Sequence, residues 1–205
     1  MIRGKLRGFP GFLMIDSNKK LLPYNQQLES RDIDSIELVV IHATELPDLA
    51  MAREYGERVH YPQSGTGNCG HFYIDRDGRV EQWVELERIA HHVAGHNERS
   101  VGIELVNRGR YPDWLDSRHQ EWQESCPADQ IAALIGLLVD LKKELPNLKL
   151  IAGHDELDTR KVPASDNPDI RVARKLDPGP DFPWSKVVAG CKLERLPGMD
   201  LNPEP

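Results

Sequence analysis

The chain has 205 residues, of which 39% are hydrophobic and 29% are charged, a composition typical of one globular domain with a buried core. No apolar run approaches the roughly 18 residues that a membrane-spanning helix needs. The formal net charge is −7 at pH 7, which disfavours nucleic acids and anionic membranes because like charges repel before contact. We therefore expect neither a nucleic acid nor a membrane among its partners.

The sequence pattern at the start of the chain predicts an arm followed by a buried strand. Residues 1–34 are polar and interrupted by glycines and prolines, which indicates an N-terminal arm over the domain surface. Its basic start leads into neither a long apolar stretch nor a small-residue cleavage site, so no secretory signal is predicted. Ile36 to His42 is apolar and rich in β-branched residues, as buried strands are. The period of two places Leu38, Val40 and His42 on one face.

The middle of the chain predicts a helix, a hairpin and a second strand. The helix is expected over Pro47 to His60, with the proline in its first turn. A glycine-rich loop at 65–70 precedes a β-hairpin at 71–84, which has Gly78 in its turn. Val101 to Val106 is the next apolar strand.

The clearest helix covers Gln130 to Leu145, where apolar residues recur along one stripe. A strand is expected over Leu148 to Ala152, with Gly153 and His154 just after its end. Beyond Val188 the chain carries three prolines, and this tail is expected to fray.

Strands that alternate with helices, together with one hairpin, indicate an α/β fold in which α-helices flank a central mixed β-sheet. We divide the chain into an N-terminal arm at 1–34, one domain at 35–190 and a C-terminal tail at 191–205. Cys69, Cys126 and Cys191 are odd in number and form no Cys-x-x-Cys pair. We therefore expect reduced thiols and a cytoplasmic location.

Three separated residues form the strongest chemical signal. His42 and His154 each stand at the end of an apolar strand, where open α/β sheets place their sites, and Asp177 precedes the stiff turn Pro-Gly-Pro. Each residue alone suits a structural role. Together, two imidazoles and one carboxylate supply the three protein ligands of a catalytic zinc with an open position. Water at such an ion has a pKa of about 7 and becomes a nucleophile at neutral pH.

Two further residues suit chemistry beside that ion. Glu104 interrupts the strand at 101–106, where an unpartnered buried carboxylate would be costly. It belongs either to an ion pair or beside the metal-bound water, as a proton acceptor. Lys175 points to the same side as Asp177 if the backbone is extended, and is either a surface lysine or a stabiliser of an oxyanion. On a strand, only one of the adjacent His91 and His92 would face a given pocket.

Taken in order, six segments resemble the zinc-dependent type-2 N-acetylmuramoyl-L-alanine amidases, an AmpD-like family that shares its fold with the peptidoglycan recognition proteins. The resemblance covers roughly residues 36–188 and rests on residues 39–44 (VVIHAT), 70–82 (GHFYIDRDGRVEQ), 90–95 (AHHVAG), 97–105 (NERSVGIEL), 153–154 (GH) and 174–180 (RKLDPGP).

This resemblance implies a zinc amidase whose catalytic domain spans 35–190, and we expect the protein to be a monomer. It would cleave the amide between N-acetylmuramic acid and L-alanine in its partner, a muropeptide or peptidoglycan. The implied roles are one Zn²⁺ held by His42, His154 and Asp177, catalysis by Glu104 and Lys175, and a substrate groove bordered by His92, Asn97 and Thr44.

The chain departs from the family pattern in three places. Ala43 follows the first ligand where a polar or aromatic residue is common. His154 and Asp177 are separated by a longer stretch than usual, and its extra part, Asp158 to Val172, is expected to form a loop near the rim of the site. One additional residue around His91 and His92 leaves open which of them faces the groove.

Several functions remain open. The acidic charge, with no export signal or wall-binding domain in the sequence, favours a cytoplasmic enzyme of peptidoglycan turnover that recycles soluble muropeptides. A phage endolysin or another wall-lytic amidase is the alternative. A non-catalytic peptidoglycan sensor is disfavoured by Glu104 and the complete ligand set. A further alternative is the iron-binding triad of an oxygenase, which usually has a carboxylate two residues after its first histidine. His42 lacks such a carboxylate, and only Glu156, two residues after His154, has this spacing.

Overall fold

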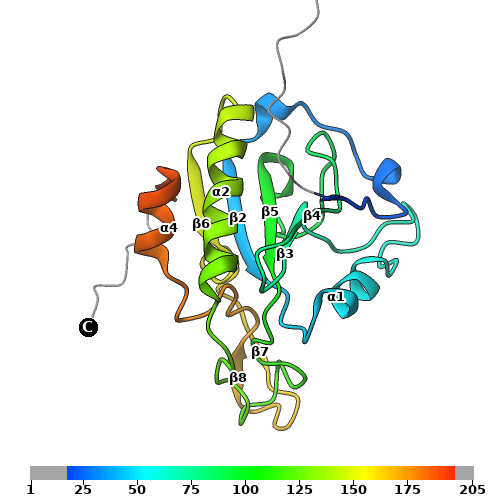
Figure 1. Ribbon diagram of the computed structural model, residues 1–205. Helices are drawn as coiled ribbons and strands as arrows, with labels where there is room; N and C mark the ends of the chain where they lie inside the picture. The colour runs from blue at the N-terminus through cyan, green and yellow to red at the C-terminus, as the bar shows by residue number, and fades with distance from the viewer. Residues whose placement is uncertain (1–17, 197–205) are drawn as a thin grey trace, which may run out of the picture.

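The computed structural model describes residues 18–196; the beginning of the expected arm, 1–17, and the end of the expected tail, 197–205, lie outside the described residues. A seven-stranded mixed sheet runs in the order β1-β4-β3-β5-β2-β6-β9, and its neighbouring strands are parallel except for the β3–β4 hairpin. This confirms the expected α/β fold with a central mixed sheet. Figure 1 labels its five central strands, β2 to β6. The strands are β1 (Asn18–Lys19), β2 (Leu38–Ala43), β3 (Phe72–Ile74), β4 (Val80–Gln82), β5 (Ser100–Leu105), β6 (Leu150–Gly153) and β9 (Glu194–Arg195).

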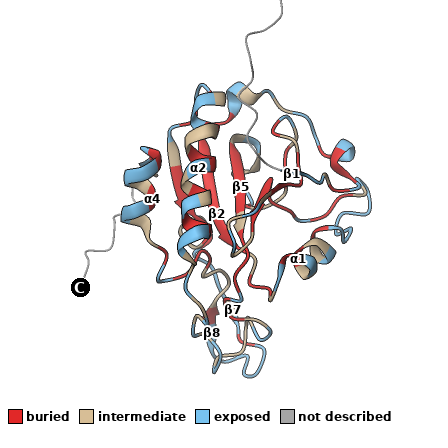
Figure 2. Ribbon diagram, viewed as in Figure 1, coloured by how far each residue is buried: buried red, intermediate tan, exposed pale blue. Residues whose placement is uncertain are grey.

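Helices cover both faces of this sheet. The long helix α2 (Ala128–Glu144) and α4 (Trp184–Cys191) pack on one face, where they form the larger hydrophobic core with β2, β3 and β5. On the other face, α1 (Leu49–Gly56) packs in a second cluster with Tyr73 and Trp83. Figure 2 shows that the central strands are buried while the outer surfaces of α2 and α4 are exposed.

The alternation of β2 directs His42 away from α2. Val39 and Ile41 belong to the core beneath α2, whereas Leu38 and Val40 belong to a small cluster on the opposite face. Because side chains alternate along a strand, His42 continues the second face, as the sequence predicts. The open end of that face is therefore available for a site.

The first helix begins later than the sequence indicates. α1 starts at Leu49 rather than at Pro47, since the carboxylate of Asp48 accepts a hydrogen bond from the Met51 N–H at 2.8 Å and caps the helix. α2 agrees with the predicted stripe, because Ile131, Leu134 and Leu138 are all buried beneath it.

The described part of the arm is integrated in the domain. β1 pairs with β4, the short 3-10 helices η1 (Asn25–Gln27) and η2 (Ile33–Ser35) follow, and Leu22, Tyr24 and Leu28 are buried. These residues supply apolar side chains to the cluster around α1. Residues 18–34 are thus mostly exposed, and these three buried side chains attach them to the domain.

The expectation of fraying beyond Val188 is wrong for residues 189–196. α4 continues to Cys191, and β9 then extends the sheet by pairing with β6. Leu193 is buried, while the Arg195 guanidinium stacks on the Trp184 ring at 3.4 Å and pairs with Glu156. Side-chain packing holds this segment in place. A polar strand of two residues carries no sequence pattern from which this packing could be predicted.

The stretch at 158–172 forms a hairpin instead of a plain loop. β7 (Lys161–Pro163) and β8 (Arg171–Ala173) pair antiparallel and project from the lower end of the molecule in Figure 1. At its base, the carboxylate of Asp158 pairs with Arg160 and Arg174. Within residues 18–196, no helix is both long and apolar enough to cross a bilayer, and the three cysteines are free.

Candidate metal centre

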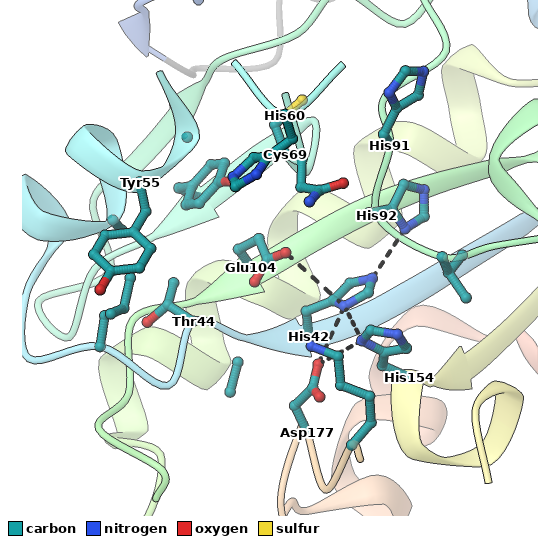
Figure 3. A pocket seen from close by; sticks show the side chains of 18 of the residues that line it. His42, Thr44, Tyr55, His60, Cys69, His91, His92, Glu104, His154 and Asp177 are labelled. Atoms are coloured by element: carbon teal, nitrogen blue, oxygen red, sulfur yellow. Dashed lines mark hydrogen bonds and ion pairs between the residues drawn. The ribbon is translucent and has the colours of Figure 1, made fainter. Parts of the chain in front are cut away.

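Three segments that are distant in the sequence meet at the open face of β2. His42 lies near the end of β2, His154 opens the short helix α3 (His154–Leu157) directly after β6, and Asp177 follows β8. The Nδ1 atom of His42 lies 2.9 Å from Nδ1 of His154 and 3.2 Å from Oδ2 of Asp177. The remaining edge, from His154 Nδ1 to Asp177 Oδ2, is 3.0 Å (Figure 3). The three residues expected from the sequence therefore converge.

This triangle fits a tetrahedral divalent cation. Zinc with bonds of about 2.0–2.1 Å separates its ligand atoms by about 3.3 Å, close to the three observed edges. Oδ1 of Asp177 is buried with no hydrogen-bond partner, so its carboxylate is not satisfied by the protein alone. Among residues 18–196, this is the one cluster of three or more His, Cys, Asp or Glu side chains able to hold an ion.

The surroundings favour the metal-binding protonation states of His42 and Asp177. Burial, followed by the charge of His154, lowers the pKa of His42 to about 4. Burial by itself would raise the pKa of Asp177, but the positive charges of Lys175 and His154 and the histidine hydrogen bonds hold it well below its usual range. Neutral imidazole and ionised carboxylate are the forms that bind metals.

Glu104 stands beside the triangle because β5 pairs with β2 in a register that sets Glu104 opposite His42. Its Oε1 atom is 3.9 Å from His42 Nδ1 (Figure 3). Among the described residues, His42 is its one ion-pair partner. Burial, reinforced by the negative charge of Asp177, raises its pKa to about 8. The carboxyl group can therefore exchange a proton near neutral pH.

Lys175 lies on the segment between β8 and Asp177, half-buried, and lines the same cavity. That segment is held by a buried residue that the sequence analysis did not single out. Arg110, 1% exposed, donates a hydrogen bond to the carbonyl of Ala173 at 3.0 Å and forms a two-pronged ion pair with Glu45. No motif marks Arg110, because its partners come from distant segments.

The ligand cluster forms the floor of a cavity of about 470 Å³. The three groove residues implied by the resemblance, Thr44, His92 and Asn97, all line it. The Asn97 side chain also supports the wall itself, since its Oδ1 accepts hydrogen bonds from the backbone N–H groups of His92 and Val93. The Thr44 hydroxyl likewise contacts the backbone of Asn107 at 3.3 Å.

Both adjacent histidines line the cavity, contrary to the expectation that only one would face it. His91 and His92 lie in an irregular turn rather than on a strand, so the alternation rule does not apply. His91 packs edge-on against Tyr61, whereas His92 contacts His42. His60, Tyr61 and Tyr55 also line the cavity, and nothing in their spacing indicates this role.

The comparison with protein families assigns residues 32–180 to a family described as N-acetylmuramoyl-L-alanine amidase (Amidase_2). A curated relative, the endolysin of Klebsiella phage KP32, is 38% identical over 85 residues, which are 42% of this chain and 52% of that relative. The match thus spans about half the length of the relative.

Solved structures share the fold. The endolysin amidase LysCS from Clostridium intestinale superimposes with a TM-score of 0.60 at 18% identity, covering 87% of this chain and 96% of that one. AmiD from E. coli, in a complex with anhydro-N-acetylmuramic acid-L-Ala-D-gamma-Glu-L-Lys, gives a TM-score of 0.59 at 23% identity and covers 78% of this chain and 58% of that one.

Proposed function

The chain belongs to the N-acetylmuramoyl-L-alanine amidase family, and on this premise we propose that it is a zinc-dependent hydrolase of the amide between N-acetylmuramic acid and L-alanine. The observation that carries the proposal is the triangle of His42 Nδ1, His154 Nδ1 and Asp177 Oδ2 with edges of 2.9, 3.2 and 3.0 Å. These three residues would hold one Zn²⁺. The ion supplies Lewis acidity, which polarises a carbonyl and acidifies water.

Glu104 and Lys175 supply the remaining chemistry from the protein. Glu104 takes a proton from the attacking water and delivers it to the nitrogen of L-alanine as the C–N bond breaks. The raised pKa of Glu104, about 8, suits a group that both accepts and donates a proton. The Lys175 ammonium, on the cavity wall, stabilises the negative charge that develops on the carbonyl oxygen.

The substrate is a muropeptide or peptidoglycan strand bound in the cavity above the ligands. His92, Asn97 and Thr44 border the groove. The structural neighbour AmiD from E. coli, in its complex with a muramyl peptide, supports this substrate class.

The role in the cell has two candidates. A cytoplasmic recycling enzyme that acts on soluble muropeptides is favoured by the net charge of −7, because an anionic envelope repels an acidic surface. An endolysin that acts on the intact wall is favoured by the curated relative from Klebsiella phage KP32. Both use the same chemistry and differ in the physical state of the substrate.

Mass spectrometry of reaction products tests activity and role together. The purified protein is incubated with a defined muropeptide and with intact sacculi, with zinc, with chelator, and with zinc restored. We expect a free stem peptide beginning with L-alanine in the zinc arms only. Binding without turnover would instead identify a sensor, and iron in the purified protein would favour the oxygenase alternative. Faster release from the muropeptide supports recycling, and faster release from sacculi supports the endolysin role.

The matched control is the Asp177→Ala variant, which lacks one ligand. We expect it to release no product in any arm, because two imidazoles alone hold zinc weakly. Product release at the wild-type rate by this variant would contradict the assignment of the metal centre.

A further inference from the structure

A line of hydrogen bonds leads from His42 away from the ligand triangle. The Nε2 atom of His42 lies 3.0 Å from Nδ1 of His92, as the dashed line in Figure 3 shows. Nε2 of His92 lies 3.2 Å from the Ser100 hydroxyl, and that hydroxyl lies 2.7 Å from the backbone carbonyl of His96. Four groups are thus joined in one chain that ends on the backbone.

The last member of this chain fixes the direction of every bond in it. A carbonyl oxygen can only accept, so the single hydroxyl proton of Ser100 is donated to His96 O. The Ser100 oxygen then accepts from His92, which requires the proton of His92 on Nε2. Neutral His92 is therefore unprotonated at Nδ1, and it accepts a hydrogen bond from Nε2–H of His42.

The consequence appears at the other side of the His42 ring. A neutral imidazole carries one proton, so a proton held on Nε2 leaves Nδ1 with a free lone pair. Nδ1 is the atom that points at His154 and Asp177. The chain thus presents the ligand atom of His42 in the form that a cation requires.

Packing restricts the His92 ring on the side that faces β5. A Cβ atom added to Gly102 would lie 2.6 Å from Cγ of His92, so the ring rests directly on the backbone of β5. Ser100, at the start of β5, is fully buried. The backbone N–H of His92 is held by Asn97 Oδ1 at 3.1 Å. The ring of His92 therefore lies against β5 on one side, and Asn97 anchors its backbone.

We propose that His92 is a positioning residue that, with Ser100, holds His42 in the Nε2–H tautomer and so prepares Nδ1 for the metal. The inference rests on the metal centre of the proposed function. It gives His92 a role that does not depend on contact with substrate. Such outer partners of metal-bound histidines typically change metal affinity by about 10- to 100-fold when they are removed.

Zinc affinity of the full chain tests this role without an activity assay. Dissociation constants are measured by competition with a chromophoric chelator. We expect His92→Phe to weaken zinc binding by about 10- to 100-fold, because the ring is kept but the acceptor is lost. His92→Asn, whose amide oxygen can stand near the position of Nδ1, should recover much of this loss, and Ser100→Ala should weaken binding to a smaller extent.

His96→Ala is the matched control. His96 contributes only its backbone carbonyl to the chain, and its side chain is not among the cavity-lining residues of the described structure. We expect wild-type zinc affinity for this variant. Wild-type affinity for both His92→Phe and Ser100→Ala would overturn the inference.

The tautomer itself is read by long-range ¹H–¹⁵N correlation spectra of the metal-free wild-type protein. We expect the Nε2–H pattern for His42, and an Nδ1–H pattern would overturn the inference even if His92→Phe fails to fold. Absence of zinc binding by the wild type would overturn the proposed function instead, which keeps the two failures distinguishable.

Discussion

At the scale of single residues, a substitution of Glu104 tests proton transfer independently of metal binding. Its Oε1 is 3.9 Å from His42 Nδ1, near the ligands but outside their triangle. We predict that Glu104→Gln binds one zinc and folds normally, while its turnover falls by about 10²- to 10⁴-fold because the proton acceptor is gone. Steady-state rates on a defined muropeptide, paired with metal analysis, check this. A wild-type rate would exclude Glu104 from catalysis.

The same residue predicts how stability varies with pH in the metal-free protein. Burial raises the pKa of Glu104 from 4.5 to about 8. Between these values the folded chain retains a proton that the unfolded chain has released, so the free energy of unfolding falls as the pH rises through this range. In Glu104→Gln this contribution should vanish. Chemical denaturation of both proteins at several pH values gives the two slopes, and identical slopes would contradict the prediction.

At the scale of elements, a buried ion pair holds the segment that carries Lys175. Arg110 and Glu45 are 1% and 5% exposed, and Arg110 also donates to the carbonyl of Ala173 at the end of β8. We predict that Arg110→Met destabilises the fold by about 3–5 kcal/mol, since it leaves the Glu45 carboxylate buried without its cationic partner. Denaturant unfolding measures the change.

The double variant Glu45→Gln/Arg110→Met is the control for this prediction. It removes the stranded charge together with its partner, so it should be more stable than Arg110→Met alone. If the single variant were as stable as the double variant, the ion pair would not be what holds this segment.

Helices and strands with a strong hydrophobic period could be predicted from the sequence. A strand that depends on contacts with distant segments could not. The apolar stripe of α2 and the alternation of β2 each report burial on a known face, and the structure confirms both. β9 has only two residues, Glu194 and Arg195, and no pattern of its own. It forms because β6 offers an open edge and Trp184 receives the Arg195 guanidinium.

At the scale of the whole molecule, a bound ion would tie together three distant parts of the chain. His42 lies in β2, whereas His154 and Asp177 follow β6 and β8, and the unfolded chain does not bring the three together. We predict that zinc at about 1,000 times its dissociation constant stabilises the fold by about 4 kcal/mol. Thermal melts with zinc and with chelator should therefore differ, and His154→Ala should show no difference. Equal melting temperatures of the wild type in both conditions would contradict a site formed by folding.

The sequence by itself determined the α/β class, the strand ends that carry His42 and His154, and the candidate ligands, because periodicity and short motifs are local properties of a chain. Tertiary structure alone decided that both His91 and His92 reach the cavity, that Arg110 anchors the segment before Asp177, and that β9 extends the sheet beside β6. Each of these depends on a contact between segments far apart in sequence. Such contacts have no local sequence pattern, because the partner residues come together only when the chain folds.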